Sequence, residues 1–312
     1  MNTMNTQSNA MPESFQAQSV APTGRSVTRP MYWSVRRELW ENRSIYIAPL
    51  AAAALFLFGF LISTIRLPDK MRGLSALDPA HQREAIAMPY DMAAGLLMLT
   101  ALIVGVFYCL DALHGERRDR SILFWKSLPV SDLITVLSKA SIPLVVLPLL
   151  TFTITVALQW IMLLLSTAVL LGNGLSVTTL WTQLSFVQMS LMLLYHLLTV
   201  HALWHAPIYG WMLLVSGWAR RAVFLWAALP LVAIAVVEKI AFNTSHFAAM
   251  LGHRLGGGEA GAALTAADMS MDPLTHITPG QFLISPGLWI GLAVAAGFLA
   301  AAVRLRRYQG PI

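Results

Sequence analysis

Six long apolar segments constrain this chain more than any other feature of its sequence. A helix needs about 20 mostly apolar residues to cross the hydrocarbon core of a bilayer. Six segments approach or exceed that length, at residues 45–65, 92–110, 142–171, 180–217, 222–237 and 288–303. The chain is therefore predicted to be an all-α polytopic membrane protein with six transmembrane helices.

The composition supports this prediction and excludes several other classes. Of the 312 residues, 57% are hydrophobic and 12% are charged, about half the charged share of a typical soluble domain. Such an apolar chain is not disordered or collagen-like. Its single cysteine, Cys109, excludes a disulfide framework and a cysteine-based metal cluster.

The distribution of basic residues predicts the orientation in the membrane. Lysine and arginine accumulate in cytoplasmic loops. If six helices alternate from a cytoplasmic N-terminus, most of the 21 basic residues fall on the cytoplasmic side. Both termini are then cytoplasmic, and the net charge of +6 needs no nucleic acid to explain it. These cytoplasmic basic residues are Arg25, Arg29, Arg36, Arg37, Arg43, Arg117, Arg118, Arg120, Lys126, Lys139, Arg220, Arg221, Arg304, Arg306 and Arg307.

The regions at the two ends of the chain are predicted to lie outside the membrane. Residues 1–30 are polar and read as a disordered cytoplasmic tail without a signal peptide, and residues 308–312 form a second tail. Residues 31–43 fit an amphipathic helix in the membrane interface, with Tyr32, Val35 and Leu39 on one face and Arg36, Arg37 and Glu38 opposite. The alternative is that this helix is simply the start of the first crossing.

Two further segments raise questions of topology. A continuous helix over residues 180–217 would rise roughly 55 Å, so this segment, interrupted by Pro207, is either one kinked helix or re-entrant. The charge distribution favours a single crossing. The outer loop at residues 241–285 shows no membrane-embedded helical pair, and its LGGGEAGAA stretch at residues 255–263 reads as a flexible surface segment.

The densest polar sequence inside the chain is the cytoplasmic segment at residues 111–139. A mixed-sign charge cluster precedes an apolar, aromatic run, Pro129 is expected to end that helix, and Ser131 can cap the next one. Aromatic side chains beside arginine are typical of a protein–protein hot spot. The alternative is a solvated loop whose aromatic rings rest on lipid headgroups.

Polar side chains also follow two of the predicted crossings. One set recurs at a spacing of four residues in the third crossing, and another lies roughly on one face of the fourth. Each set either lines a translocation path or holds neighbouring helices together. The candidate path residues are Thr151, Thr155, Gln159, Ser185, Gln188, Tyr195 and Thr199.

The sequence GERRDRSILFWKSLPVSD resembles the segment that follows the second membrane helix in bacterial ABC-2 type permeases. The resemblance extends over residues 31–307 and includes APIYGWMLLVSGWARRAVFLW at residues 206–226. It implies a type V exporter-like architecture, a homodimer in the bacterial inner membrane, and a coupling helix that docks on a separate ATPase subunit. The implied docking residues are Glu116, Arg117, Arg118, Asp119, Arg120, Ser121, Phe124, Trp125, Lys126, Leu128 and Pro129.

The expected function is that of a non-catalytic permease subunit, which exports a substrate when its partner hydrolyses ATP. The chain contains no Gly-Lys pair and hence no phosphate-binding loop, so ATP and Mg²⁺ are expected on the ATPase. No cofactor, metal or nucleic acid is expected on this chain, and membrane lipids are expected to surround it.

Two other functions compete with this one. The first is an intramembrane enzyme that uses His196, His201 and His205, although no acid or cysteine accompanies them and a structural role for these histidines is favoured. The second is a non-transporting membrane anchor or sensor for an ATPase-like partner. Cys109 is expected to be a small buried apolar side chain.

Overall fold

The computed structural model describes residues 28–74, 78–127, 130–258, 279–308 and 310, and this part of the chain is helical without strands. Six of its helical segments are long and apolar enough to cross a membrane, which confirms the six segments found in the sequence. They are Ser44–Gly73, His81–Arg118, Asp132–Gly172, Thr178–Trp204, Val223–Phe242 and Pro286–Tyr308. The chain is thus a multi-pass helical membrane protein.

The N-terminal helix α1, Thr28–Glu41, precedes the first long helix, α2, Ser44–Ser63. It begins three residues earlier than predicted, and residues 1–27 lie outside the described part of the chain. Val35 and Leu39 pack on the core, whereas Tyr32 of the same predicted face is exposed, as are Trp33 and Trp40. Glu38, which the sequence places on the polar face opposite Val35 and Leu39, is completely buried.

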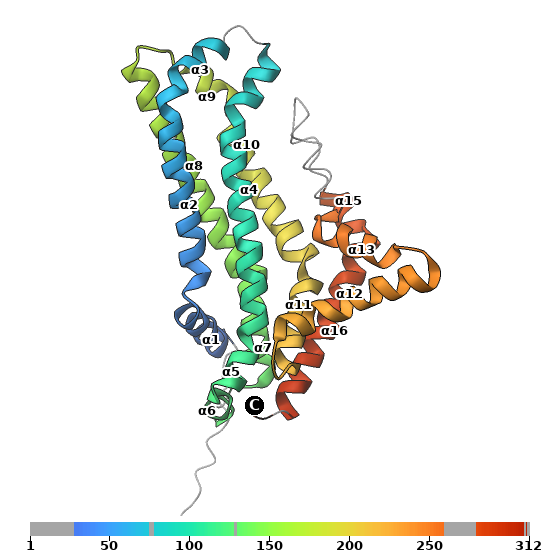
Figure 1. Cartoon of the computed structure of the whole chain (residues 1–312). Helices are drawn as coiled ribbons and strands as arrows, with labels where there is room; N and C mark the ends of the chain where they lie inside the picture. The colour runs from blue at the N-terminus through green and yellow to red at the C-terminus, as the bar shows by residue number, and fades with distance from the viewer. Residues whose placement is uncertain (1–27, 75–77, 128–129, 259–278, 309, 311–312) are drawn as a thin grey trace, which may run out of the picture.

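Helices α2, α4 (Pro79–Ala112) and α8 (Leu147–Gly172) form the main bundle. Its core contains the completely buried residues Ala93, Leu97 and Met162. A second core cluster, nearer the C-terminal end of α4, surrounds Leu147 and Tyr209. The helix α3, Leu67–Leu74, and the short helix α9, Thr178–Gln183, lie at the other end of this bundle (Figure 1).

The long fourth segment is one bent run of helices that crosses the bundle. It consists of α10 (Phe186–His196), a π-helix (Leu197–Trp204) and α11 (Ala206–Trp218). Gln188 near its start bonds to Arg83 early in α4, whereas Gly217 near its end contacts Leu113 just after α4. The segment therefore runs in the same direction as α4 from one end of that helix to the other, so the re-entrant alternative is wrong.

The helix after the fourth segment diverges from the bundle. Helix α12, Val223–Phe242, lies across the direction of the other long helices (Figure 1), and only 6% of its most apolar stretch is buried. The predicted outer loop contains two short helices, α13 (His246–Leu255) and α15 (Pro279–Ile284), before α16, Pro286–Tyr308.

The sequence pattern did not reveal these two helices, which pack beside the long helices; that the loop has no membrane-embedded helical pair stays a prediction. Arg254 at the end of α13 bonds to Gly287 in α16, and Phe282 in α15 packs on Trp204 of the π-helix. In the LGGGEAGAA stretch, which was predicted to be a flexible surface segment, Leu255 and Gly256 are exposed, but Gly257 and Gly258 are buried, so the prediction is wrong for these two glycines. Residues 259–263 lie outside the described residues.

Candidate functional site

The predicted coupling segment consists of two short helices with a sharp break. Helix α5, His114–Arg118, follows α4 directly, and α6 spans Ser121–Ser127. Between them Arg120 has a φ of 58°, a left-handed conformation that is unusual for a residue other than glycine. At the start of α5, the Ser216 hydroxyl oxygen accepts bonds from the backbone N–H groups of Leu113 and His114. Together these features fix the direction in which the two helices leave α4.

The inner side of α5 carries a buried carboxylate, Glu116. Its Oε1 lies 3.1 Å from Lys139 Nζ and 3.0 Å from Arg37 Nη2, and its Oε2 pairs with Arg306. Arg37 belongs to α1, Lys139 to α7 (Asp132–Ser141), and Arg306 to the last turns of α16. Glu116 thus joins the coupling segment to three other helices.

A second buried carboxylate, Glu38 of α1, completes this arrangement. Its Oε1 lies 2.9 Å from Lys139 Nζ and 2.6 Å from Arg37 Nη2. Its Oε2 accepts a bond of 2.8 Å from the Tyr108 hydroxyl of α4. We call the set Arg37, Glu38, Glu116, Asp132, Lys139 and Arg306 the ion cluster, in which Asp132 pairs with Arg306 at 3.2 Å.

The ion cluster balances three cations against three carboxylates. Burial alone raises the pKa of Glu38, but Lys139 and Arg37 outweigh it and hold the pKa below its usual value. The same proximity to carboxylates raises the pKa of Arg37, even though burial acts to lower it. Removing one partner from such a cluster leaves a buried charge unpaired, which costs about 3–5 kcal/mol. The cluster therefore fixes the relative positions of α1, α5, α7 and α16.

Arg117 forms another connection, to the end of α11. Its Nη1 donates to the backbone oxygens of Gly217 and Ala219 at 2.6 and 3.4 Å, and its Nε donates to Gly310 at 3.3 Å. The last carbonyls of a helix have no partners within that helix. Arg117 satisfies such carbonyls, so that α5 is held to α11 as well as to the helices of the ion cluster.

The outer side of the segment is exposed, basic and apolar. Leu123 and Phe124 are 58% and 60% exposed, and Arg118 and Lys126 are exposed beside them. Trp125 is half-buried. Its ring contacts the Phe124 ring edge to face, and the centroid of its ring lies 3.8 Å from the guanidinium carbon of Arg37. Trp125 therefore links the exposed face to the ion cluster.

The predicted docking residues are divided by this geometry. Glu116 and Arg117 are buried and face other helices, so neither forms part of an exposed surface in this chain. Ser121 is half-buried and bonds to the Glu116 backbone oxygen at 3.4 Å. Leu128 and Pro129 lie outside the described residues, while Ser131 caps α7 as predicted, by accepting a bond from Ile134 N–H. Of the other predicted residues Trp125 is half-buried, and the rest are exposed, namely Arg118, Asp119, Arg120, Phe124 and Lys126.

The polar residues of the third crossing face the interior of the bundle. Thr151, Thr155 and Gln159 are buried, and the Gln159 amide donates to the Tyr90 backbone oxygen of α4 at 3.2 Å. Ser166, which the sequence pattern missed, continues the same buried face of α8. Within one chain this face packs on α4.

The polar residues of the fourth crossing have other surroundings. Ser185 is exposed, and Gln188 accepts a bond from Arg83 of α4 at 3.2 Å. Tyr195 is half-buried, and its backbone oxygen accepts a bond from the hydroxyl of Thr199, which lies one turn further along the segment. Gln159 and Gln188 thus bond to α4 and Thr199 to its own helix, whereas the buried Thr151 and Thr155 hydroxyls have no hydrogen-bond partner among the described residues. The role of the two sets as a translocation path stays a prediction.

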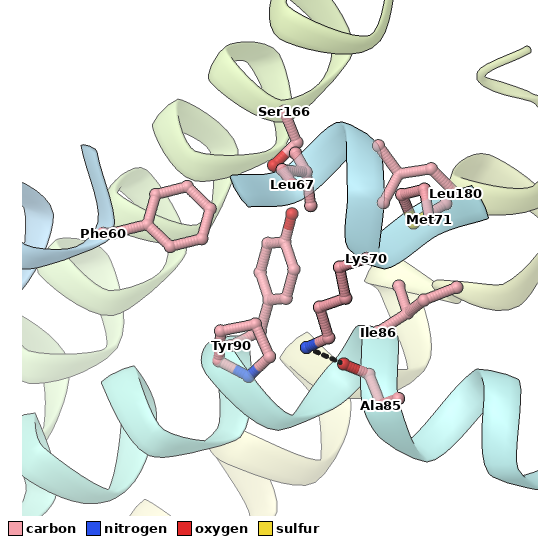
Figure 2. A pocket seen from close by; sticks show the side chains of 10 residues that line it. Phe60, Leu67, Lys70, Met71, Ala85, Ile86, Tyr90, Ser166 and Leu180 are labelled. Atoms are coloured by element: carbon pink, nitrogen blue, oxygen red, sulfur yellow. Dashed lines mark hydrogen bonds between the residues drawn. The ribbon is translucent and has the colours of Figure 1, made fainter. Parts of the chain in front are cut away.

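A small cavity lies near the end of the bundle opposite α5 and α6. It measures about 30 Å³, lies beside α3 and is lined by Tyr90, Lys70, Ser166 and apolar side chains. Figure 2 shows the Tyr90 hydroxyl pointing toward Ser166, and Lys70 Nζ donating to the Ala85 backbone oxygen at 3.1 Å. A cavity of this size has room for a water molecule, which is too little for an organic substrate.

The histidines of the fourth crossing surround the π-helix. His201 and His205 are buried, His201 Nε2 lies 3.2 Å from the Tyr209 hydroxyl, and His205 Nε2 donates to the Leu255 backbone oxygen at 3.3 Å. Among the described residues, no group of three histidine, cysteine or acidic side chains is arranged to hold a metal ion. Cys109 is buried, as predicted.

Comparisons of the chain with protein-family models, with curated proteins and with solved structures found no match.

Proposed function

We propose that this chain is the membrane-spanning permease subunit of an ATP-driven exporter of the ABC-2 type, working as a homodimer with a separate ATPase subunit. The observation that carries the proposal is the two-sided α5–α6 segment. Its outer side exposes Leu123 and Phe124 among basic residues, and its inner side holds Glu116 in the ion cluster. One element thus combines a surface for a partner with rigid attachment to the membrane helices.

The mechanism follows from these attachments. A partner that closes beneath α6 displaces Phe124 and Trp125, and Trp125 lies against Arg37 of α1. Glu116 carries the same displacement to α7 and α16 through Lys139 and Arg306. Since the ion cluster resists separation of its members, the helices move with the segment instead of sliding past it.

The basic surface around α6 indicates the chemistry of the partner. The exposed residues Arg220 and Arg221, in the turn after α11, extend the positive charge of Arg118 and Lys126. An acidic rim around an apolar pocket would complement this surface. A partner ATPase in the cytosol requires the α5–α6 end of the bundle to be cytoplasmic, which is the orientation that the distribution of basic residues in the sequence predicts.

The proposal is tested by replacing the exposed anchor together with one basic neighbour. We expect Phe124→Ala with Arg118→Glu to release the ATPase that co-purifies with the wild-type chain, because buried aromatic anchors contribute about 2 kcal/mol or more to an interface. Phe242→Ala is the matched control, since Phe242 is 74% exposed at the far end of α12. Full ATPase binding and substrate-coupled activity in the double variant would contradict the proposal.

A further inference from the structure

Two neighbouring spans contain a π-helix at the place where they lie side by side. In the third span the π-helix Ile142–Val146 separates α7 from α8, and in the fourth the π-helix Leu197–Trp204 separates α10 from α11. The His205 N–H, for example, bonds at 3.1 Å to the oxygen of Val200, five residues back, instead of four back as in an α-helix. Cα atoms of the two π-helices approach within 8 Å of one another. The two interruptions therefore form one layer across the bundle.

Proline weakens the backbone of both spans at this layer. Pro143 lies within the first π-helix, Pro148 is the second residue of α8, and Pro207 is the second residue of α11. Each proline lacks the N–H that would bond to the preceding turn. Sharp kinks in helices occur mainly at proline and at π-helical turns, and π-helices occur frequently at functional sites. The third and fourth spans thus bend more readily here than along their α-helical parts.

A glycine of α4 lies against both spans next to this layer. A Cβ at Gly105 would lie 3.2 Å from Tyr209 Cε1 and 3.5 Å from Leu147 Cδ1. Leu147 directly follows the first π-helix, and Tyr209 lies just beyond the second. Both belong, with Ile142 of the first π-helix, to one buried cluster. A bend in one span therefore shifts side chains that pack on the other.

The helices on one side of this layer are attached to the α5–α6 segment. Lys139 of α7 lies 3.1 Å from Glu116. The Ser216 hydroxyl of α11 accepts the two N–H bonds at the start of α5, and Arg117 donates to the Gly217 oxygen at 2.6 Å. A displacement of α5 is therefore carried to α7 and α11 together.

The helices on the other side of the layer are attached to α4 instead. Gln159 of α8 donates to the Tyr90 oxygen at 3.2 Å, and Gln188 of α10 accepts a bond from Arg83. Helices α8 and α10 lie toward the far end of the bundle, whereas α7 and α11 lie toward α5 and α6 (Figure 1). The two halves of each span thus have different attachments, and the π-helices lie between them.

We propose that the two π-helices form a single hinge, about which α7 and α11 swing together with the α5–α6 segment while α8 and α10 stay against α4. The hinge is a property of the single chain. In the proposed exporter, closure of the ATPase drives this swing, and that use of the hinge rests on the proposed function. The motion itself is measurable without the ATPase, so a failure of the hinge is distinct from a failure of ATPase docking.

The test measures distances between pairs of spin labels by pulsed electron resonance on the purified full chain in nanodiscs. Cys109→Ala serves as the background, because Cys109 is the only cysteine. All labelled positions are exposed. Labels at Leu137 and Leu164 span the first π-helix, labels at Leu191 and Trp218 span the second, and labels at Met92 and Phe107 on the unbroken α4 form the control pair.

We expect both hinge pairs to give distance distributions at least about twofold broader than the control pair, since a kink at a proline or π-helix turns a helix by roughly 20° or more. Pro143→Ala restores an N–H in the first π-helix and should narrow the distribution of the Leu191–Trp218 pair as well as that of its own span. Pro230→Ala, which changes a proline inside α12, is the matched control and should leave both distributions broad.

Two results would overturn the proposal. The first is a pair of hinge distributions as narrow as that of the control pair. The second is narrowing confined to the third span in Pro143→Ala, because the two spans then bend independently. If Pro143→Ala does not fold, Gly105→Ala decides, since its Cβ pushes on Tyr209 and Leu147, whereas a Cβ at Gly95 of the same helix meets no atom within 4 Å. Gly105→Ala should shift both hinge distributions and Gly95→Ala neither, and unchanged distributions in Gly105→Ala would contradict the hinge.

Discussion

Lys139 lies between the two buried glutamates of the ion cluster, at 2.9 Å from Glu38 and 3.1 Å from Glu116. Its side chain is 2% exposed, so water cannot replace it. We expect Lys139→Met to lower the free energy of unfolding by about 3–5 kcal/mol, because it leaves two buried carboxylates short of a partner. Tyr108→Phe removes only one neutral donor to Glu38 and should cost less, about 1.5–3 kcal/mol.

Thermal unfolding of the purified chain in detergent measures both effects. Lys239→Met is the control, since Lys239 is exposed on α12 and its loss should leave the melting temperature unchanged. A melting temperature for Lys139→Met equal to that of the control would show that the ion cluster does not hold these helices together.

The lowered pKa of Glu38 also predicts how stability depends on pH. A carboxylate whose pKa is lower in the folded state stabilises the fold above its unfolded pKa, and this contribution is lost as the pH falls through the folded pKa. We therefore expect the melting temperature to fall as the pH drops below the ordinary glutamate value of about 4.3. Glu38→Gln has no charge to lose at this position, so it should show a smaller fall. An identical pH profile for the two proteins would rule out Glu38 as a source of the effect.

At the scale of single elements, the break between α5 and α6 is the feature most open to a local test. The left-handed conformation of Arg120 costs a residue with a Cβ about 1 kcal/mol, whereas glycine adopts it freely. We expect Arg120→Gly to be more stable than Arg120→Ala by about that amount, since both lose the charge and only glycine relieves the backbone. The comparison of melting temperatures checks this. Equal stability of the two variants would mean that the break does not depend on this conformation.

The elements also show what the sequence could and could not predict. The apolar segments and the Ser131 cap depend on neighbouring residues, and both are confirmed. The ion cluster joins residues as far apart in the chain as Glu116 and Arg306, which no local pattern reveals. Two local signals of the cluster were present in the sequence: Lys139 stands in an otherwise apolar run, and Glu38 lies one turn after the core residue Val35.

Other wrong predictions from the sequence have similar causes. Glu116 and Arg117 look like surface charges in sequence, but their partners come from α7, α11 and α16. The glycines at 256–258 suggest flexibility, yet Gly258 is required by the Trp204 ring that packs on it. In both cases distant packing decided the outcome, and composition alone gave the wrong interpretation.

At the scale of the whole molecule, the two ends of the bundle differ in chemistry. Helix α1, the α5–α6 segment and the last turns of α16 meet at one end (Figure 1), joined by the ion cluster. The other long surfaces are apolar, and α12 has almost none of its apolar stretch buried. In the proposed transporter this apolar surface is covered by lipid or by a second copy of the chain, and the charged end faces the ATPase.

The most direct test of this account is to purify the tagged full chain from its own cells in mild detergent and to identify what remains bound. The account predicts an ATPase of the ATP-binding cassette class in a stoichiometric complex, released by Phe124→Ala with Arg118→Glu and retained by Phe242→Ala. A wild-type chain that purifies without any such ATPase, or that retains it equally in the double variant, would contradict the central claim.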